Sequence, residues 1–204
     1  EPAGCYWIPD DNTDPDGFAR LFSMDPNGEN AFGKALKNHD IIIMKSCFPN
    51  SLIQENNIIK DTINPGRRSL YNYKRHYLSI RDAVDKHPNK IFIIVTQPPM
   101  HPHDTSGAEA ERAKAFVAWI KSEEYLGGRK NLFVLDYFGF LADQRTGMLR
   151  KEYQIDPQGK DSHPNPIAQM FAGPYFADFI INAVRSGTNA DAPVVTFDNP
   201  GWPM

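Results

Sequence analysis

The stretch Lys90-Ile91-Phe92-Ile93-Ile94-Val95-Thr96 holds five consecutive apolar residues, four of them β-branched. A run of this length and composition is typical of a β-strand that is buried on both faces, as strands of parallel sheets are. Two similar runs occur at residues 40–45 and 132–136. The sequence therefore predicts three buried strands, near residues 40–45, 90–96 and 132–136, that lie side by side in one sheet.

Segments with helical periodicity separate the three runs. Residues 66–86 carry apolar side chains at i, i+3 and i+4 spacing, which predicts a long helix. The next helix is predicted to begin at Thr105 or Ser106, with Glu109 at capping-box spacing from Ser106, and to end at Gly127-Gly128. Alternation of strands and helices predicts a three-layer α/β/α fold with a mainly parallel sheet and right-handed crossovers.

The chain of 204 residues has the length of one domain. We assign residues 1–186 to a single α/β domain that ends with a helix over about 166–185, and residues 187–204 to a C-terminal tail. Its 41% hydrophobic and 23% charged residues are ordinary for a soluble globular protein. Lys and Arg are scattered and no apolar run approaches the ~20 residues of a membrane span, so we expect neither a nucleic-acid partner nor a membrane span.

The two cysteines, Cys5 and Cys47, bear on the compartment. One disulfide between them would suit an exported protein, whereas Cys47 could equally be a buried apolar residue at a strand end. The chain opens at Glu1 without a Met, which suggests a processed or truncated product. Together with 17 prolines and loops rich in Asn, Asp and Gly, these features favour a secreted or cell-surface location.

The stretch Asp161-Ser162-His163-Pro164-Asn165 is the strongest candidate for a functional site. Pro164 disfavours helical backbone at His163, and a proline at residue 166 suits the first turn of the helix that follows. His163 is therefore predicted on a fixed loop just before a helix, with a carboxylate two residues away. This pattern favours a general base oriented by Asp161; the alternative is a turn that only starts the helix.

Two further polar loops follow predicted strands, at residues 46–51 and 97–103. In open α/β sheets ligands bind at the edge where the strands end, so these loops should border the same site as His163. His101 and His103, with Asp104 next, present ligand types that suit zinc. Because alternate loop residues usually point apart, we assign no metal ligand and expect no cofactor.

The arrangement resembles the SGNH/GDSL hydrolase superfamily. The specific match is D-S-H-P at residues 161–164, while "DIIIMKSCFPN", "IFIIVTQPP" and "NLFVLDYFGFLAD" match in pattern over about residues 36–185. The resemblance implies a flavodoxin-like strand order and an esterase acting on acyl or acetyl esters, such as those of a carbohydrate. It also implies His163 as general base, Asp161 as its support and Asn50 as an oxyanion donor.

The Gly-Asp-Ser block that carries the nucleophile in this superfamily is not found in the chain. Three explanations stay open. The nucleophile strand precedes Glu1 in a longer gene product; or Ser46 or Cys47, just past a predicted strand, has taken over the role; or the domain binds without cleaving, as a structural subunit of a surface or extracellular assembly.

Overall fold

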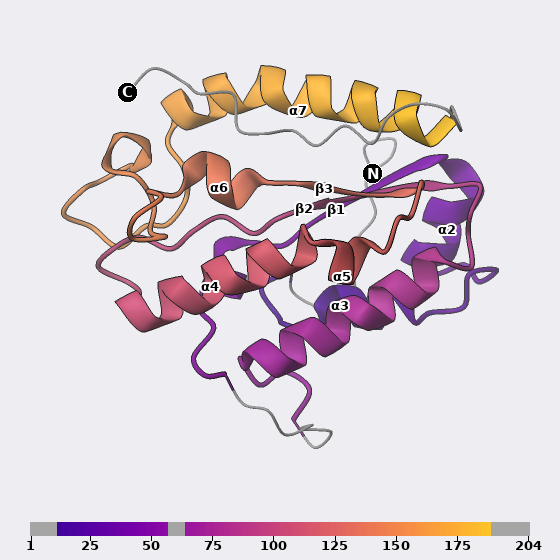
Figure 1. Ribbon diagram of the computed structural model, residues 1–204, viewed down its shortest axis with the longest axis horizontal. Coiled ribbons are helices and arrows are strands. Elements are labelled where there is room, and N and C mark those ends of the chain that lie inside the picture. The colour runs from indigo at the N-terminus through magenta and orange to yellow at the C-terminus, as the bar shows by residue number, and fades with distance from the viewer. Residues whose placement is uncertain (1–11, 57–63, 189–204) are drawn as a thin grey trace.

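The computed structural model describes residues 12–56 and 64–188 of the chain. Three parallel strands form one sheet in the order β1-β2-β3, with β1 at Ile41–Lys45, β2 at Ile91–Val95 and β3 at Leu132–Leu135. Helices cover the sheet on both sides, which gives the three-layer α/β/α architecture seen in Figure 1. The predicted fold class and the three adjacent parallel strands are confirmed.

The pairing register decides which side chains share a face of the sheet. Ile41 pairs with Ile91 and Ile43 with Ile93, and Phe92 pairs with Leu132 in the next strand. Successive residues of a strand point to opposite faces, and paired residues of neighbouring strands point to the same face. The odd-numbered residues of β1 and β2 therefore face one helical layer and the even-numbered residues face the other.

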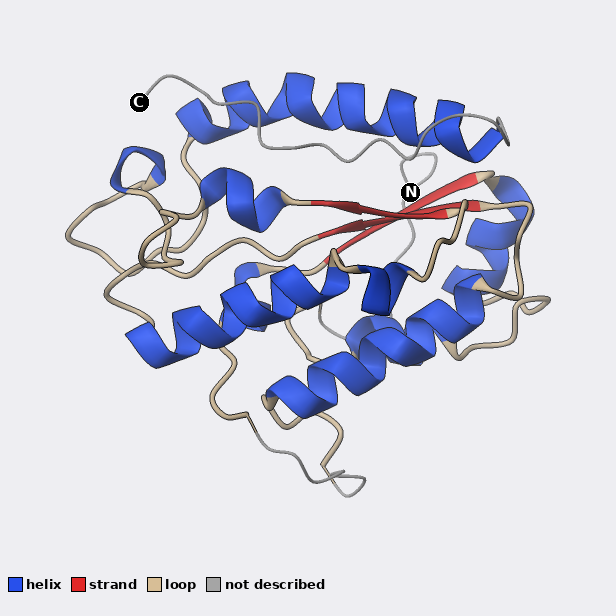
Figure 2. Cartoon of the chain, viewed as in Figure 1, coloured by secondary structure: helices blue, strands red, loops and turns tan. Residues whose placement is uncertain are grey.

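The larger core lies on the even-numbered side. It is covered by α1 (Gly17–Phe22), α2 (Ala31–Asn38), α3 (Leu70–Val84), α4 (Gly107–Ile120) and α5 (Glu123–Leu126). Phe92 and Ile94 of β2 pack there with Tyr77 of α3 and Phe116 of α4, whose rings meet edge to face at 4.9 Å between centroids. This layer occupies the lower half of the view in Figure 2.

The opposite layer is formed chiefly by α7 (Pro166–Thr188), together with α6 (Tyr137–Leu141). Ala168, Ala172 and Ala183 are buried in the core that also contains Ile91 and Ile93. These small side chains let the helix backbone come close to the sheet. Two short 3-10 helices complete the described structure, Phe48–Ser51 and Lys151–Tyr153.

The prediction that residues 40–45 are buried on both faces is wrong. Ile41 and Ile43 are 37% and 47% exposed, and only Met44 of β1 is buried. The reason is positional: β1 is the edge strand of the described sheet, and α7 packs over β2 and β3. Burial of all five residues, as the apolar run suggests, holds for the central strand β2 alone.

Several helix boundaries also differ from expectation. The long helix α3 begins at Leu70 rather than near residue 66, because the Ser69 side chain accepts the N–H of Asn72 and caps it there. The α4 helix stops at Ile120, and Gly127, with φ of 57°, ends the separate helix α5. The segment 138–160 contains most of α6 and a 3-10 turn.

Some predictions fall outside the described residues. The Cys5–Cys47 bridge is one, because Cys5 lies in the segment 1–11; Cys47 itself is half-buried just after β1. Most of the predicted tail, from residue 189 onward, is another. Among the helices of residues 12–56 and 64–188, none has the length and hydropathy needed to cross a bilayer.

The predicted capping box is present at the start of α4. The backbone N–H of Ser106 donates to Glu109 Oε2 at 2.8 Å, and the N–H of Glu109 donates to Ser106 Oγ at 3.3 Å. Ser106→Ala removes the second bond and should lower the free energy of unfolding by about 1 kcal/mol in urea titrations. Ser79→Ala, which removes an exposed hydroxyl in α3 but no cap, is the control; an equal loss in both variants would contradict the assignment.

Candidate functional site

The loop that precedes α7 is held in place by its own side chains. Asn165 caps the helix by accepting the N–H of Ala168 at 3.0 Å, and its amide group donates to the carbonyls of Glu152 and Gln154. Pro166, the first residue of α7, needs no N–H partner in this position. The loop therefore enters the helix in one defined conformation.

Asp161 and His163 form a hydrogen-bonded pair on this loop. His163 Nδ1 lies 2.6 Å from Asp161 Oδ1, and the backbone N–H of His163 donates to the same oxygen at 2.9 Å. An ionised carboxylate only accepts hydrogen bonds, so Nδ1 carries the proton and Nε2 of the neutral ring keeps its lone pair. The His163 side chain is 60% exposed and the Asp161 side chain 48%, which leaves the imidazole accessible.

Hydrogen bonding also sets the charge state of the carboxylate. The backbone N–H of His163, and then its ring, hold the pKa of Asp161 below the ordinary value of that side chain. Both donors favour the ionised form. Asp161 is therefore a stable anion beside the imidazole, as a residue that supports a base must be.

The loop after β1 reaches the same place. Phe48 packs edge to face against the His163 ring, with centroids 4.7 Å apart and an interplanar angle of 86°. Phe48 begins the 3-10 helix that follows β1, so the predicted proximity of the 45–51 loop to His163 is present.

The loop after β2 is joined to the candidate site by a buried hydrogen bond. The backbone N–H of His101 donates to Ser162 Oγ at 2.8 Å, and both residues are almost completely buried. His103 adds a second connection through its Nδ1, 3.1 Å from the carbonyl of Gly159. All three predicted loops therefore meet around the segment 159–163.

His101 and His103 are not arranged as a pair of metal ligands. The Nδ1 of His101 accepts the backbone N–H of His103 at 3.1 Å, and its Nε2 is buried without a hydrogen-bond partner. The Nδ1 of His103 is engaged with Gly159. Within residues 12–56 and 64–188, no group of three or more His, Cys, Asp or Glu side chains is placed to hold a metal ion.

Ser46 points into the large core instead of toward solvent. It is 3% exposed, and its hydroxyl is hydrogen-bonded to Tyr77 of α3. Burial raises the pKa of Tyr77 to about 12, and the bond to Ser46 offsets part of that rise. In this arrangement Ser46 is not accessible to a substrate, so the geometry gives no support to a relocated nucleophile at this position.

Asn50 is committed to a structural role in this conformation. Its Nδ2 donates to the carbonyls of Asn12 and Asp14 at 2.9 and 3.3 Å, and its Oδ1 accepts the hydroxyl of Tyr73 at 3.2 Å. Both amide hydrogens are used, so none is left for an oxyanion. The predicted donor instead fastens the segment at residues 12–14 to the loop after β1.

Two residues of this edge had not been singled out from the sequence. Tyr137, directly after β3, has its ring centroid 5.7 Å from Lys45 Nζ, and burial lowers the pKa of that lysine. Gln97 follows β2 with a fully buried side chain whose amide atoms have no hydrogen-bond partner, an uncommon state for buried polar groups. The sequence offered only their position as an indication that they lie near the site, since each residue directly follows a predicted strand.

Comparison of the chain with protein-family models, with curated proteins and with solved structures found no match in any of the three.

The lowered pKa of Asp161 can be measured by following its carboxyl carbon in an NMR titration. The midpoint should fall below the unfolded-state value of about 3.9. Because the folded pKa is the lower one, the stability that ionised Asp161 contributes is present above about pH 4 and lost as the pH falls through the folded pKa. In His163→Ala the backbone donor remains, so the midpoint should rise only part of the way. A midpoint at the unfolded value in the native protein would contradict the observed bonding.

The bond from His101 to Ser162 gives a second prediction. Ser162→Ala leaves the buried N–H of His101 without its acceptor, which should cost about 1–3 kcal/mol of unfolding free energy. Ser79→Ala removes an exposed hydroxyl in α3 and should change stability little. Equal stability of the two variants in urea titrations would show that the buried bond is not formed.

Proposed function

We propose that this protein is an SGNH/GDSL-like ester hydrolase that acts on acyl or acetyl esters, including those of carbohydrates, in a secreted or cell-surface setting. The observation that supports the proposal best is the Asp161–His163 pair, bonded at 2.6 Å with an exposed imidazole. A carboxylate that holds Nδ1–H leaves Nε2 as the proton acceptor, which is the arrangement a general base requires.

In the proposed reaction His163 Nε2 takes the proton of a nucleophilic hydroxyl as its oxygen bonds to the ester carbonyl carbon. Asp161 stabilises the imidazolium that forms. The imidazolium then gives the proton to the leaving alkoxide, so an alcohol departs and an acyl-enzyme remains. Water, deprotonated by the same nitrogen, hydrolyses that intermediate and restores the hydroxyl.

The proposal takes the nucleophile from outside the described residues. Ser46 is buried and bonded to Tyr77, whereas β1 is the edge strand of the described sheet and has no described strand on its outer side. A parallel strand paired there would end at the same edge as the loops around His163. Its last residues would therefore lie where a nucleophile is needed.

A second candidate function is a non-catalytic SGNH-like subunit that binds or builds a surface or extracellular assembly. It is favoured by the state of the predicted catalytic partners: Ser46 is buried, and both amide hydrogens of Asn50 are bonded to backbone carbonyls. In this alternative the Asp161–His163 pair only shapes the turn before α7.

Hydrolysis of a chromogenic acetyl ester and of acetylated oligosaccharides by the native full-length protein tests the proposal. His163→Ala should lower kcat/KM by about 10²–10⁴-fold, the range of general acid–base catalysis. His39→Ala, which changes a half-buried histidine just before β1, is the matched control and should keep full activity.

The outcome separates the two candidates. Loss of activity in His163→Ala but not in His39→Ala supports the hydrolase. Absence of ester hydrolysis in the native full-length protein, or activity that survives removal of the His163 imidazole, contradicts it and leaves the binding subunit.

A further inference from the structure

The exposed large apolar side chains gather on one layer of the molecule. Of the seven in the described ranges, only Ile155 lies elsewhere. The other six are on α7 and β1: Ile41, Ile43, Ile167, Met170, Phe171 and Ile181. On α7, Met170 and Phe171 lie three and four residues after Ile167, and Ile181 lies ten residues after Phe171, along a helix about 34 Å long, since each residue adds 1.5 Å. Contiguous apolar surface of this kind marks an interaction site more often than scattered residues do.

The two β1 residues face the same side as α7. Ile41 and Ile43 are in register with Ile91 and Ile93, which are buried in the core that α7 covers. Because α7 packs over β2 and β3, the strip over β1 beside it is left exposed. The layer thus combines an exposed helix surface with an adjacent exposed strip of sheet.

The helix and the strand can be aligned by height. Gly187 of α7 packs closely against Ile91, because a Cβ atom built onto this glycine would lie 3.1 Å from Ile91 Cδ1. Ile91 pairs with Ile41, so these two residues lie at the same height in the sheet. Asp178 is nine residues before Gly187, or about 13.5 Å along the helix. Lys45 is four residues beyond Ile41, or about 13 Å along the strand. Asp178 is therefore level with Lys45.

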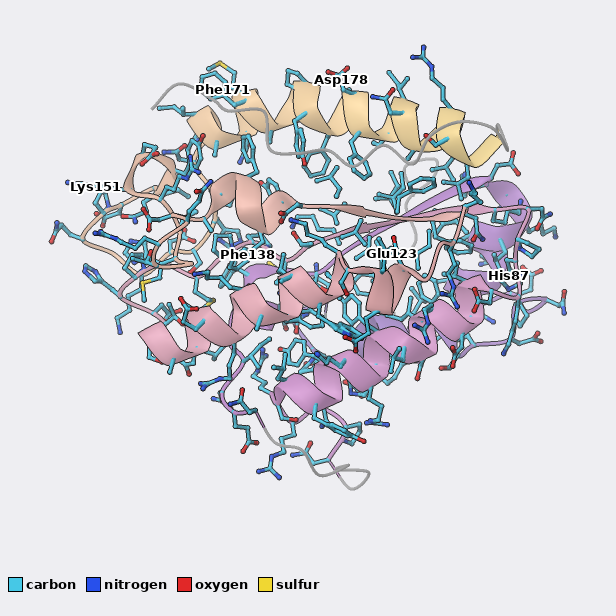
Figure 3. The ribbon with its side chains drawn as sticks, viewed as in Figure 1. His87, Glu123, Phe138, Lys151, Phe171 and Asp178 are labelled. Atoms are coloured by element: carbon cyan, nitrogen blue, oxygen red, sulfur yellow. The ribbon has the colours of Figure 1, made fainter. Side chains whose placement is uncertain are left out.

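The same alignment applies to the apolar residues. Ile181 is six residues before Gly187, about 9 Å along the helix, and Ile43 is two residues beyond Ile41, about 7 Å along the strand. Asp178 and Lys45 carry opposite charges, and neither forms an ion pair within the described residues. Figure 3 shows Asp178 and Phe171 on the side of α7 that is turned away from the sheet.

We propose that two copies of this chain form a symmetric dimer in which α7 of each copy lies over β1 of the other. A two-fold axis parallel to α7 places the two helices side by side between the two sheets. Because rotation about this axis does not move a residue along it, equivalent residues of the two copies stay at the same height along the helix. Ile181 of one copy then meets Ile43 of the second copy, and Asp178 faces its Lys45. Such an interface is isologous, because the same surface serves both copies.

A second copy fits this surface because the surface is complementary to itself. It contains an apolar helix surface that carries Asp178 and Arg185, and an apolar strip that ends at Lys45, which is at the same height as Asp178. The interface brings Ile181 of α7 together with Ile41 and Ile43 of β1, all of which are exposed in one copy. The dimer does not involve the outer backbone edge of β1, and its oligomeric state can be measured independently of the proposed hydrolase activity.

Sedimentation equilibrium of the full chain over a wide range of concentration tests the dimer. The native protein should show a concentration-dependent dimer, and Ile181→Glu should be monomeric because it places a charge opposite Ile43. Ile155→Glu changes an equally exposed isoleucine outside the surface and should dimerise as the native protein does. A monomeric native protein, or a dimer that survives Ile181→Glu, overturns the proposal.

A charge exchange tests the alignment itself. Asp178→Lys and Lys45→Glu should each raise the dissociation constant of the dimer by at least about tenfold, as loss of a close interfacial charge pair does. The double variant places the two charges in exchanged positions and should recover most of the affinity. Additive losses in the double variant would show that the two residues do not meet, and would overturn the proposed arrangement.

Discussion

The candidate site depends on one buried hydrogen bond, from the backbone N–H of His101 to Ser162 Oγ. These residues are 61 positions apart in the chain, and the bond joins the loop after the central strand to the loop before α7. Ser162 stands between Asp161 and His163, so fixing its side chain fixes the backbone that presents both. The packing of Phe48 on His163 adds the loop after β1. The loops that follow the neighbouring strands β1 and β2 therefore both contact the segment that carries the imidazole.

The edge strand β1 and the central strand β2 show how position controls burial in this fold. β2 has a strand on each side and a helical layer on each face, and all five of its residues are buried. β1 has an equally apolar sequence, but only one paired neighbour and one covered face. The apolar residues that remain exposed on β1 therefore mark a surface left to be covered. That surface motivates the proposed dimer, while the backbone edge of the same strand is where the proposed nucleophile strand would pair.

Sequence reasoning succeeded where the determining interactions are local. The capping box at Ser106, the buried run of β2 and the helix start after Pro164 each depend on a few adjacent residues, and all are present. It failed where distant contacts decide. Whether Ile43 is buried depends on where α7 lies, and the amide of Asn50 is used by carbonyls of residues 12 and 14. Neither contact can be predicted from the residues adjacent to Ile43 or Asn50 in the sequence.

Asp161 holds the His163 ring with its proton on Nδ1, which leaves Nε2 as the nitrogen that can act as a base. A long-range ¹H–¹⁵N correlation spectrum of the native protein distinguishes the two nitrogens directly. In the neutral ring we expect Nδ1 to be protonated and Nε2 not to be; this is the expected result. A neutral His163 with its proton on Nε2 would contradict it, because Nδ1 could then donate nothing to Asp161.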